Sequence, residues 1–121
     1  MFNNFKTREI KMTITTLKLE GRIDSAAASK LEAGFAAKTG TVVEKSDKAI
    51  IDLNDLVYIS SLGIRMLVSA IKQFKQRGVE FVTVRPRDNT ASELLITVDL
   101  ASHMNMVEDA EAAHAQLHKI W

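Results

Sequence analysis

Residues 49–71 read AIIDLNDLVYISSLGIRMLVSAI and join two kinds of pattern. The apolar run from Ala49 to Leu53 is too short and too clearly bounded for a helix, so it predicts a buried strand. After a mixed connection over residues 54–59, Ser60 and Ser61 precede apolar residues that recur every three or four positions, which is typical of an amphipathic helix. Because serine accepts hydrogen bonds from the free N–H groups of a first helical turn, we expect the pair to start this helix, with hydroxyls near solvent.

The segment before this stretch predicts β-structure. Residues 17–23 alternate between apolar or glycine positions and charged positions, which indicates a strand with one buried face. Before this segment the apolar residues stand at even-numbered positions instead, as Ile10, Met12 and Ile14. Near residues 15–16 the chain therefore contains either a bulge or a turn between two strands, and both alternatives stay open.

Four helices are predicted in all. Asp24 and Ser25 provide an N-cap signal for a helix over residues 26–38, which Gly40 ends and a polar loop over residues 39–48 follows. The helix after Ser61 ends at Gly78. The remaining expected elements are a strand at 79–84 closed by Pro86, a short helix to about Thr97 capped by Asn89 or Thr90, a weak strand at 104–107 and a helix at 109–118.

This alternation of strands and helices predicts an α/β fold. Parallel neighbours need crossover connections, so we expect one domain with a mixed, largely parallel sheet and about four helices packed on it. The expected boundaries are an N-terminal extension or edge segment at residues 1–9 and the domain at residues 10–121.

Composition excludes several classes of partner. The 121 residues carry 16 basic and 15 acidic side chains, a formal charge of +1, so nothing favours binding to nucleic acid or to an anionic membrane. There is no cysteine, hence no disulfide or thiolate metal site. No apolar run resembles a secretion signal or approaches the roughly 18 residues of a membrane span. We therefore expect a cytoplasmic protein.

The residues carry no convincing catalytic constellation. A nucleophilic Ser60 or Ser61 would need a nearby base, and the three histidines all lie at the C-terminal end, as His103, His114 and His118. The i, i+4 pair His114 and His118 lacks an acidic partner fixed by the sequence, and no phosphate-binding loop or dinucleotide fingerprint occurs. We expect no enzyme, no metal and no cofactor.

Two runs, Ile51–Leu53 and Val57–Ile64, resemble the signature of the anti-sigma factor antagonist family, the bacterial STAS domains. In that signature an apolar strand ends in Asp-Leu, and a spacer carries Val and an aromatic residue. The spacer is followed by Asp or Ser, and then by Ser, a small residue, Gly, and Leu or Ile. The order of elements also agrees, so the resemblance covers most of residues 10–121.

The resemblance implies a binding switch. In this family the unmodified protein binds an anti-sigma factor, often itself a serine kinase, and thereby frees a sigma factor. The kinase phosphorylates the antagonist and a serine phosphatase restores it. Ser61 matches the phosphorylated position, with Ser60 as an alternative acceptor. The partner-binding surface is expected to comprise Asp24, Asn54, Asp55, Tyr58, Ser60, Ser61, Leu62, Gly63 and Arg65.

Two positions depart from the family pattern and define the alternatives. Ser60 stands where many members have Asp, a variant that the family tolerates, and Leu62 stands where members have Ser, Thr or Ala. Leu62 favours an alternative in which the scaffold binds its partner constitutively, without phosphorylation. A further hypothesis is a ligand-sensing module that uses the loops around Asp24 and Asn54-Asp55.

Overall fold

A sheet of four parallel strands forms the centre of the molecule. In the computed structural model, which describes residues 13–45 and 47–118, the strand order is β1-β3-β5-β6. Every neighbouring pair in this sheet is parallel. The predicted N-terminal extension at 1–9, with Ile10 and Met12, lies outside the described residues. The strands are β1 (Ile14–Lys18), β3 (Lys48–Asp52), β5 (Phe81–Val84) and β6 (Met106–Val107).

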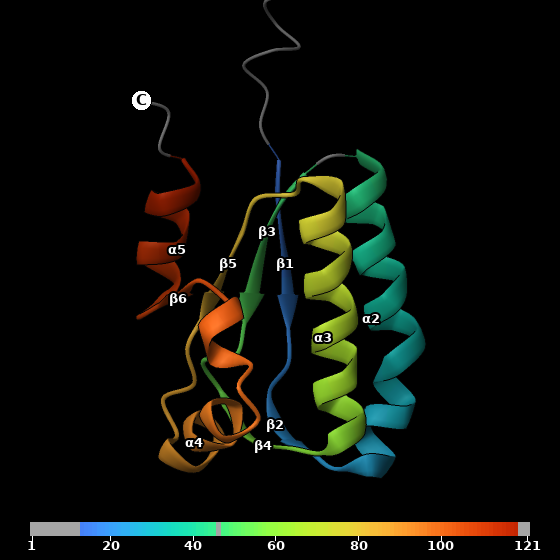
Figure 1. Ribbon diagram of the computed structural model, residues 1–121, viewed down its shortest axis with the longest axis vertical. Helices are drawn as coiled ribbons and strands as arrows, with labels where there is room; N and C mark the ends of the chain where they lie inside the picture. Colours follow the sequence, from blue (N-terminus) through green and yellow to red (C-terminus); the bar gives the residue numbers. More distant parts are fainter. Residues whose placement is uncertain (1–12, 46, 119–121) are drawn as a thin grey trace, which may run out of the picture.

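A second, two-stranded pair continues two of these strands. β2 (Gly21–Ile23) pairs in parallel with β4 (Leu56–Ile59), so that Arg22 lies opposite Tyr58 and Ile23 opposite Ile59. Figure 1 shows this pair at the end of the molecule where β1 and β3 finish. Gly21 has a φ of 73°, a left-handed backbone conformation that glycine adopts without strain, at the point where the register shifts. The chain thereby changes its pairing partner between β1 and β2.

The β2–β4 pair corrects two sequence predictions. Residues 17–23 do not form one strand, because the chain breaks at residues 19–20, later than the predicted switch near residues 15–16. Residues 54–59 are more than a connection, because they contain β4. The alternation still predicted burial correctly, since Leu17, Leu19 and Ile23 are all buried. The strand partner changes from β3 for β1 to β4 for β2. This change depends on the tertiary structure, and the alternation of side chains does not predict it.

Helices cover both faces of the four-stranded sheet (Figure 1). α2 (Ser25–Lys45) and α3 (Ser61–Arg77) pack side by side over one face and enclose the main core. α5 (Ala110–Leu117) covers part of the other face, where Ile50, Val82 and Val84 meet Ala113 and Leu117. α4 (Asn89–Thr97) packs against β4 and is followed by a short 3-10 helix at Ala101–His103. The described residues thus contain four α-helices, as expected.

Helix α2 runs further than predicted. It passes through Gly40 and ends at Lys45, so most of the predicted polar loop at 39–48 is helical. Phe35, Thr39 and Val42 are buried at spacings of four and three, and the Thr39 hydroxyl donates to the Phe35 carbonyl. Continued burial therefore outweighs the roughly 1 kcal/mol that a mid-helix glycine costs. The N-cap of α4 is Asp88, one residue before the predicted Asn89.

Candidate functional site

The two serines at the start of α3 have different environments. Ser60 is the N-cap, only 7% exposed, and its Oγ accepts a hydrogen bond of 3.3 Å from the Gly63 N–H. Ser61 is the first helical residue and is exposed. The prediction that the pair starts the helix is confirmed, whereas the prediction that both hydroxyls lie near solvent is wrong for Ser60. A cap must point back towards the N–H groups of the first turn, which turns Ser60 inward.

The starts of α2 and α3 lie next to each other because each follows a strand of the same parallel pair. The Ser60 N–H donates to the Ile23 carbonyl at 2.8 Å, which ties the end of β4 to the end of β2. Asp24 caps α2, with its Oδ1 accepting from the Ala27 N–H at 2.9 Å. Two helix N-termini with positive dipole ends therefore meet at the edge where Ser61 is exposed.

Gly63 and Leu62 fix the start of α3 against the core. A Cβ atom on Gly63 would lie 2.6 Å from the Ile59 Cγ1 and 3.2 Å from the Ile23 Cγ2, so only glycine fits this approach. Leu62 is half-buried and packs against the main core. These two residues hold the helix while Ser61, immediately before them, stays in solvent.

A partly apolar surface lies on β4 beside the start of α3. Tyr58 is half-buried, and the Arg22 guanidinium carbon lies 4.6 Å from the centre of its ring in a cation–π contact. Val57 is 41% exposed and lines a separate hollow with Asn54 and Arg87, because neighbouring residues of a strand point to opposite faces. Sequence reasoning identified Tyr58 but missed Arg22 and Val57, because the pairing of β2 with β4 brings Arg22 to this surface.

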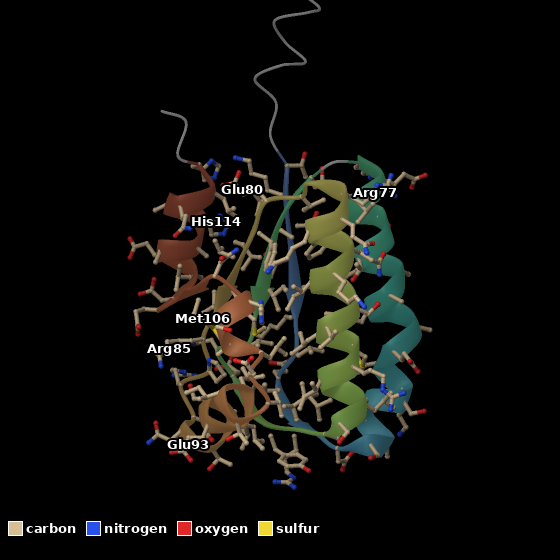
Figure 2. All side chains as sticks on the ribbon, in the orientation of Figure 1. Arg77, Glu80, Arg85, Glu93, Met106 and His114 are labelled. Atoms are coloured by element: carbon tan, nitrogen blue, oxygen red, sulfur yellow. The ribbon has the colours of Figure 1, made fainter. Side chains whose placement is uncertain are left out.

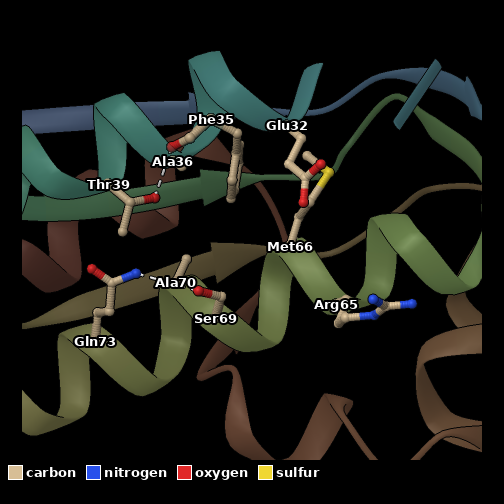
Figure 3. A pocket seen from close by; sticks show the side chains of 9 residues that line it. All are labelled: Glu32, Phe35, Ala36, Thr39, Arg65, Met66, Ser69, Ala70 and Gln73. Carbon is tan, nitrogen blue, oxygen red and sulfur yellow. Dashed lines mark hydrogen bonds between the residues drawn. The ribbon is translucent and has the colours of Figure 1, made fainter. Parts of the chain in front are cut away.

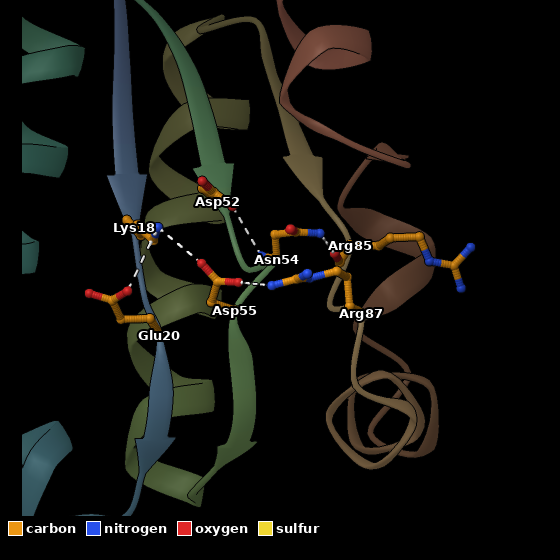
Figure 4. Close-up of polar contacts among 7 residues, drawn as sticks. All are labelled: Lys18, Glu20, Asp52, Asn54, Asp55, Arg85 and Arg87. Atoms are coloured by element: carbon orange, nitrogen blue, oxygen red, sulfur yellow. Dashed lines mark hydrogen bonds and ion pairs between the residues drawn. The ribbon is translucent and has the colours of Figure 1, made fainter.

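Asn54 and Asp55 lie at the opposite end of β4 from Ser61 and belong to a network of hydrogen bonds and ion pairs (Figure 4). The Asp55 carboxylate bonds to Arg87 and, at 3.2 Å, to the Lys18 Nζ. The Asn54 side-chain amide donates to the Arg85 carbonyl at 3.2 Å. The network thereby joins the end of β1, the β3–β4 turn and the chain after β5.

The network shifts the pKa values of Asp55 and Lys18. The hydrogen bond from Arg87, followed by that from Lys18, lowers the pKa of Asp55. The hydrogen bond to Asp55 raises the pKa of Lys18. Both shifts favour the charged forms, so the network is complete across the neutral pH range.

The remaining predicted positions lie beyond the first residues of α3. Arg65 lies one turn into α3 and is exposed. The rings of His114 and His118 stack with centroids 6.1 Å apart, and Figure 2 shows His114 on α5, away from α2 and α3. Residues 13–45 and 47–118 contain no group of three or more side chains that could hold a metal ion. In the same ranges, no helix combines the length and apolar character needed to cross a bilayer.

The fold and this edge define a small α/β protein that displays a serine at a helix start. A model of the STAS domain family matches residues 5–112. BtrV of Bordetella bronchiseptica, named as a candidate anti-sigma factor antagonist, is 34% identical over 98 residues, which cover 78% of this chain and 81% of that protein. The chain therefore belongs to the STAS domain family of anti-sigma factor antagonists, as its sequence pattern predicted.

The fold is also similar to that of a solved relative. The structure of the Bacillus cell fate determinant SpoIIAA in its phosphorylated form matches with a TM-score of 0.63. The match covers 90% of this chain and 95% of that chain at 15% sequence identity. This likeness supports the STAS-type arrangement of a largely parallel sheet with four helices.

Proposed function

We propose that the protein binds an anti-sigma factor with serine kinase activity, and that phosphorylation of Ser61 blocks this binding. A serine phosphatase then restores the binding-competent form. The observation that carries the proposal is the contrast within the serine pair, since Ser61 is exposed whereas Ser60 is buried with its hydroxyl in a cap. This contrast favours Ser61 over Ser60 as the acceptor.

The physical effect of a phosphate at Ser61 differs between the free protein and a complex. Phosphoserine carries a charge of about −1.5 to −2 at neutral pH. At the start of α3 this charge faces the positive end of the helix dipole and free N–H groups, so the fold tolerates it. In a docked interface the same charge must lose water and meet the partner's surface, which weakens binding.

The surface around Ser61 has the composition of a binding face. Tyr58 and Arg22 offer an aromatic and a guanidinium contact, and both kinds of side chain are typical of interface centres. Asp24 borders the same edge, and Leu62 and Gly63 shape it from below. Asn54 and Asp55 support it through the network at the other end of β4. Arg65 extends it along α3.

The test combines the purified protein with an anti-sigma factor kinase from the same genome and ATP. Mass spectrometry should locate phosphate on Ser61 of the wild type and find none on Ser61→Ala. Ser61→Asp should weaken binding to the anti-sigma factor by about tenfold or more while leaving the circular dichroism spectrum unchanged. Equal affinity for Ser61→Asp and wild type would refute the switch. Binding without any phosphate transfer would favour the constitutive scaffold that Leu62 suggests.

A further inference from the structure

Helix α3 carries positive charge without any acidic residue. Its 17 residues include Arg65, Lys72, Lys75 and Arg77 and no Asp or Glu. Lys75 and Arg77 lie in the last turn, where cations interact favourably with the helix dipole. Arg65 and Lys72 gain nothing from the dipole there, and Lys72 has a like charge three residues away in Lys75, which costs a helix about 0.2–0.5 kcal/mol. Neither the helix dipole nor an acidic neighbour within α3 therefore accounts for the charges of Arg65 and Lys72.

Within the part of the chain that the structure describes, these cations also form no ion pair. Among the described residues, the salt bridges involve Lys18, Lys48, Arg85 and Arg87, and none involves a cation of α3. Arg65 and Lys72 are both exposed and stand seven residues apart, which places them on the same side of the helix about 10 Å apart along its axis. Two unpaired cations two turns apart form a regular pattern of charge.

A groove runs beside these cations between α2 and α3. A hollow of 260 Å³ has Phe35, Met66 and Ala70 among its apolar lining, with Arg65 and Ser69 on its α3 side (Figure 3). A shallower hollow of 420 Å³ on the outer side of α3 shares Arg65 and Ser69 and extends to Lys72 and Gln76. We call this surface, defined by Phe35, Met66, Ala70, Arg65, Ser69 and Lys72, the α3 groove. Along α3 it spans about two helical turns.

We propose that the α3 groove binds an acidic amphipathic helix of the partner; that this partner is the anti-sigma factor rests on the proposed function. The apolar side of such a helix packs on Met66 and Ala70, and carboxylates seven residues apart reach Arg65 and Lys72. Arg65 can bind a carboxylate through two parallel hydrogen bonds. The groove begins one turn from Ser61, so one partner can contact both places.

The opposite rim of the groove sets the orientation of the bound helix. Glu32 lies on the α2 side, and Figure 3 shows the Arg65 side chain directed away from it. An acidic stripe on the partner is repelled by Glu32 and attracted by Arg65, which turns the stripe towards α3. The same carboxylate disfavours a phosphate backbone or an anionic lipid surface, since those ligands present negative charge to both rims at once.

The first experiment measures binding of defined probes to the full-length protein by fluorescence anisotropy. The probes are a synthetic helix with Leu on one face and Glu on the other, the same helix with Gln for Glu, a random-sequence DNA duplex, and phosphatidylserine vesicles. The Glu helix should bind most tightly, and Arg65→Glu/Lys72→Glu should weaken it by about tenfold. Lys30→Glu/Lys38→Glu, the same charge change in a hollow on the other side of α2, should leave it unchanged.

Three results would overturn the acidic-helix proposal. The first is equal affinity for the Glu and Gln helices, and the second is an equal loss of affinity for the Glu helix in both double variants. The third is tighter binding of DNA or vesicles than of the Glu helix, if this binding depends on Arg65 and Lys72. Circular dichroism and thermal melting of each double variant exclude misfolding, because all four substituted positions are exposed.

A second experiment separates this proposal from the proposed function. The anti-sigma factor is titrated with wild type, Ser61→Asp and Arg65→Glu/Lys72→Glu. Loss of affinity in both variants supports both proposals. Loss in Ser61→Asp alone contradicts the groove and leaves the phosphorylation switch intact. If the wild type fails to bind the anti-sigma factor, the proposed function fails, and the peptide probes still decide whether the groove takes an acidic helix.

Discussion

The four-stranded sheet and the β2–β4 pair are both parallel, yet they differ in how much of each strand is buried. β3 buries Ala49, Ile50 and Ile51 in succession, because α2 and α3 cover one face of the sheet and α5 covers the other. β4 buries Leu56 and Ile59 but exposes Val57 and half-exposes Tyr58. The sheet therefore serves as a rigid base, and the β2–β4 pair holds Arg22 and Tyr58 at the surface beside the start of α3.

The largest loss of stability should come from the core over the sheet. Phe74 is fully buried, with its ring centroid 5.6 Å from that of Phe81. Phe74→Ala should lower the free energy of unfolding by about 3–5 kcal/mol, measured by urea denaturation. Leu31→Ala, at a position 40% exposed, is the control and should change little. A loss below about 1 kcal/mol for Phe74→Ala would contradict the view of the sheet as the rigid base.

A smaller loss should follow from crowding the β4–α3 junction. Gly63→Ala places a methyl group 2.6 Å from the Ile59 side chain, and the resulting overpacking should cost about 1–3 kcal/mol. Gly34→Ala on α2 is the matched control, because its methyl group meets no atom within 4 Å and should stabilise the protein by about 0.4–1 kcal/mol. Equal effects in the two variants, measured by thermal unfolding, would show that the junction is loosely packed.

Ser60 and Ser61 are adjacent, yet Ser60 has a structural role as a helix cap and Ser61 is exposed. Substituting each serine in turn tests this difference. Ser60→Ala removes the cap of α3 and should cost about 1 kcal/mol. Ser61→Ala removes an exposed hydroxyl and should stay within about 0.5 kcal/mol of the wild type. Chemical denaturation of both variants measures the difference. The reverse order of stabilities would mean that Ser61 is the structural residue.

The smallest effect concerns the network at the far end of β4. Because the folded-state pKa of Asp55 lies below its ordinary value of 3.8, its contribution to stability is present above that value and is lost as pH falls through the lowered pKa. Asp55→Asn should therefore lower the urea midpoint at neutral pH and converge with the wild type in strong acid. The control is Glu93→Gln on α4. It also removes a carboxylate, but among the described residues Glu93 forms no ion pair. A gap between wild type and Asp55→Asn that persists unchanged in acid would contradict the assignment.

The local patterns of the chain predicted most elements and part of the site. The apolar run at residues 49–53 and the helical spacing after Ser61 predicted β3 and α3, and Gly78 ends α3 in a left-handed conformation as expected. Ser60 and Ser61 marked the helix start because capping is a local interaction between neighbouring residues. The same locality explains the failure at α2, where Gly40 predicted a stop although burial of Val42 extends the helix.

The sequence by itself determined the order of the four helices and of β3, β5 and β6, the family resemblance and the position of the serine pair, because these depend on neighbouring residues. Only the tertiary structure decided that β2 pairs with β4, that Arg22 covers Tyr58 and that Asp55 joins Lys18 to Arg87. It also decided which serine is buried, since the Ser60 N–H bonds to Ile23, 37 residues away in the chain. The physical reason is that long-range pairing depends on the packing of whole layers, which no local pattern of residues contains.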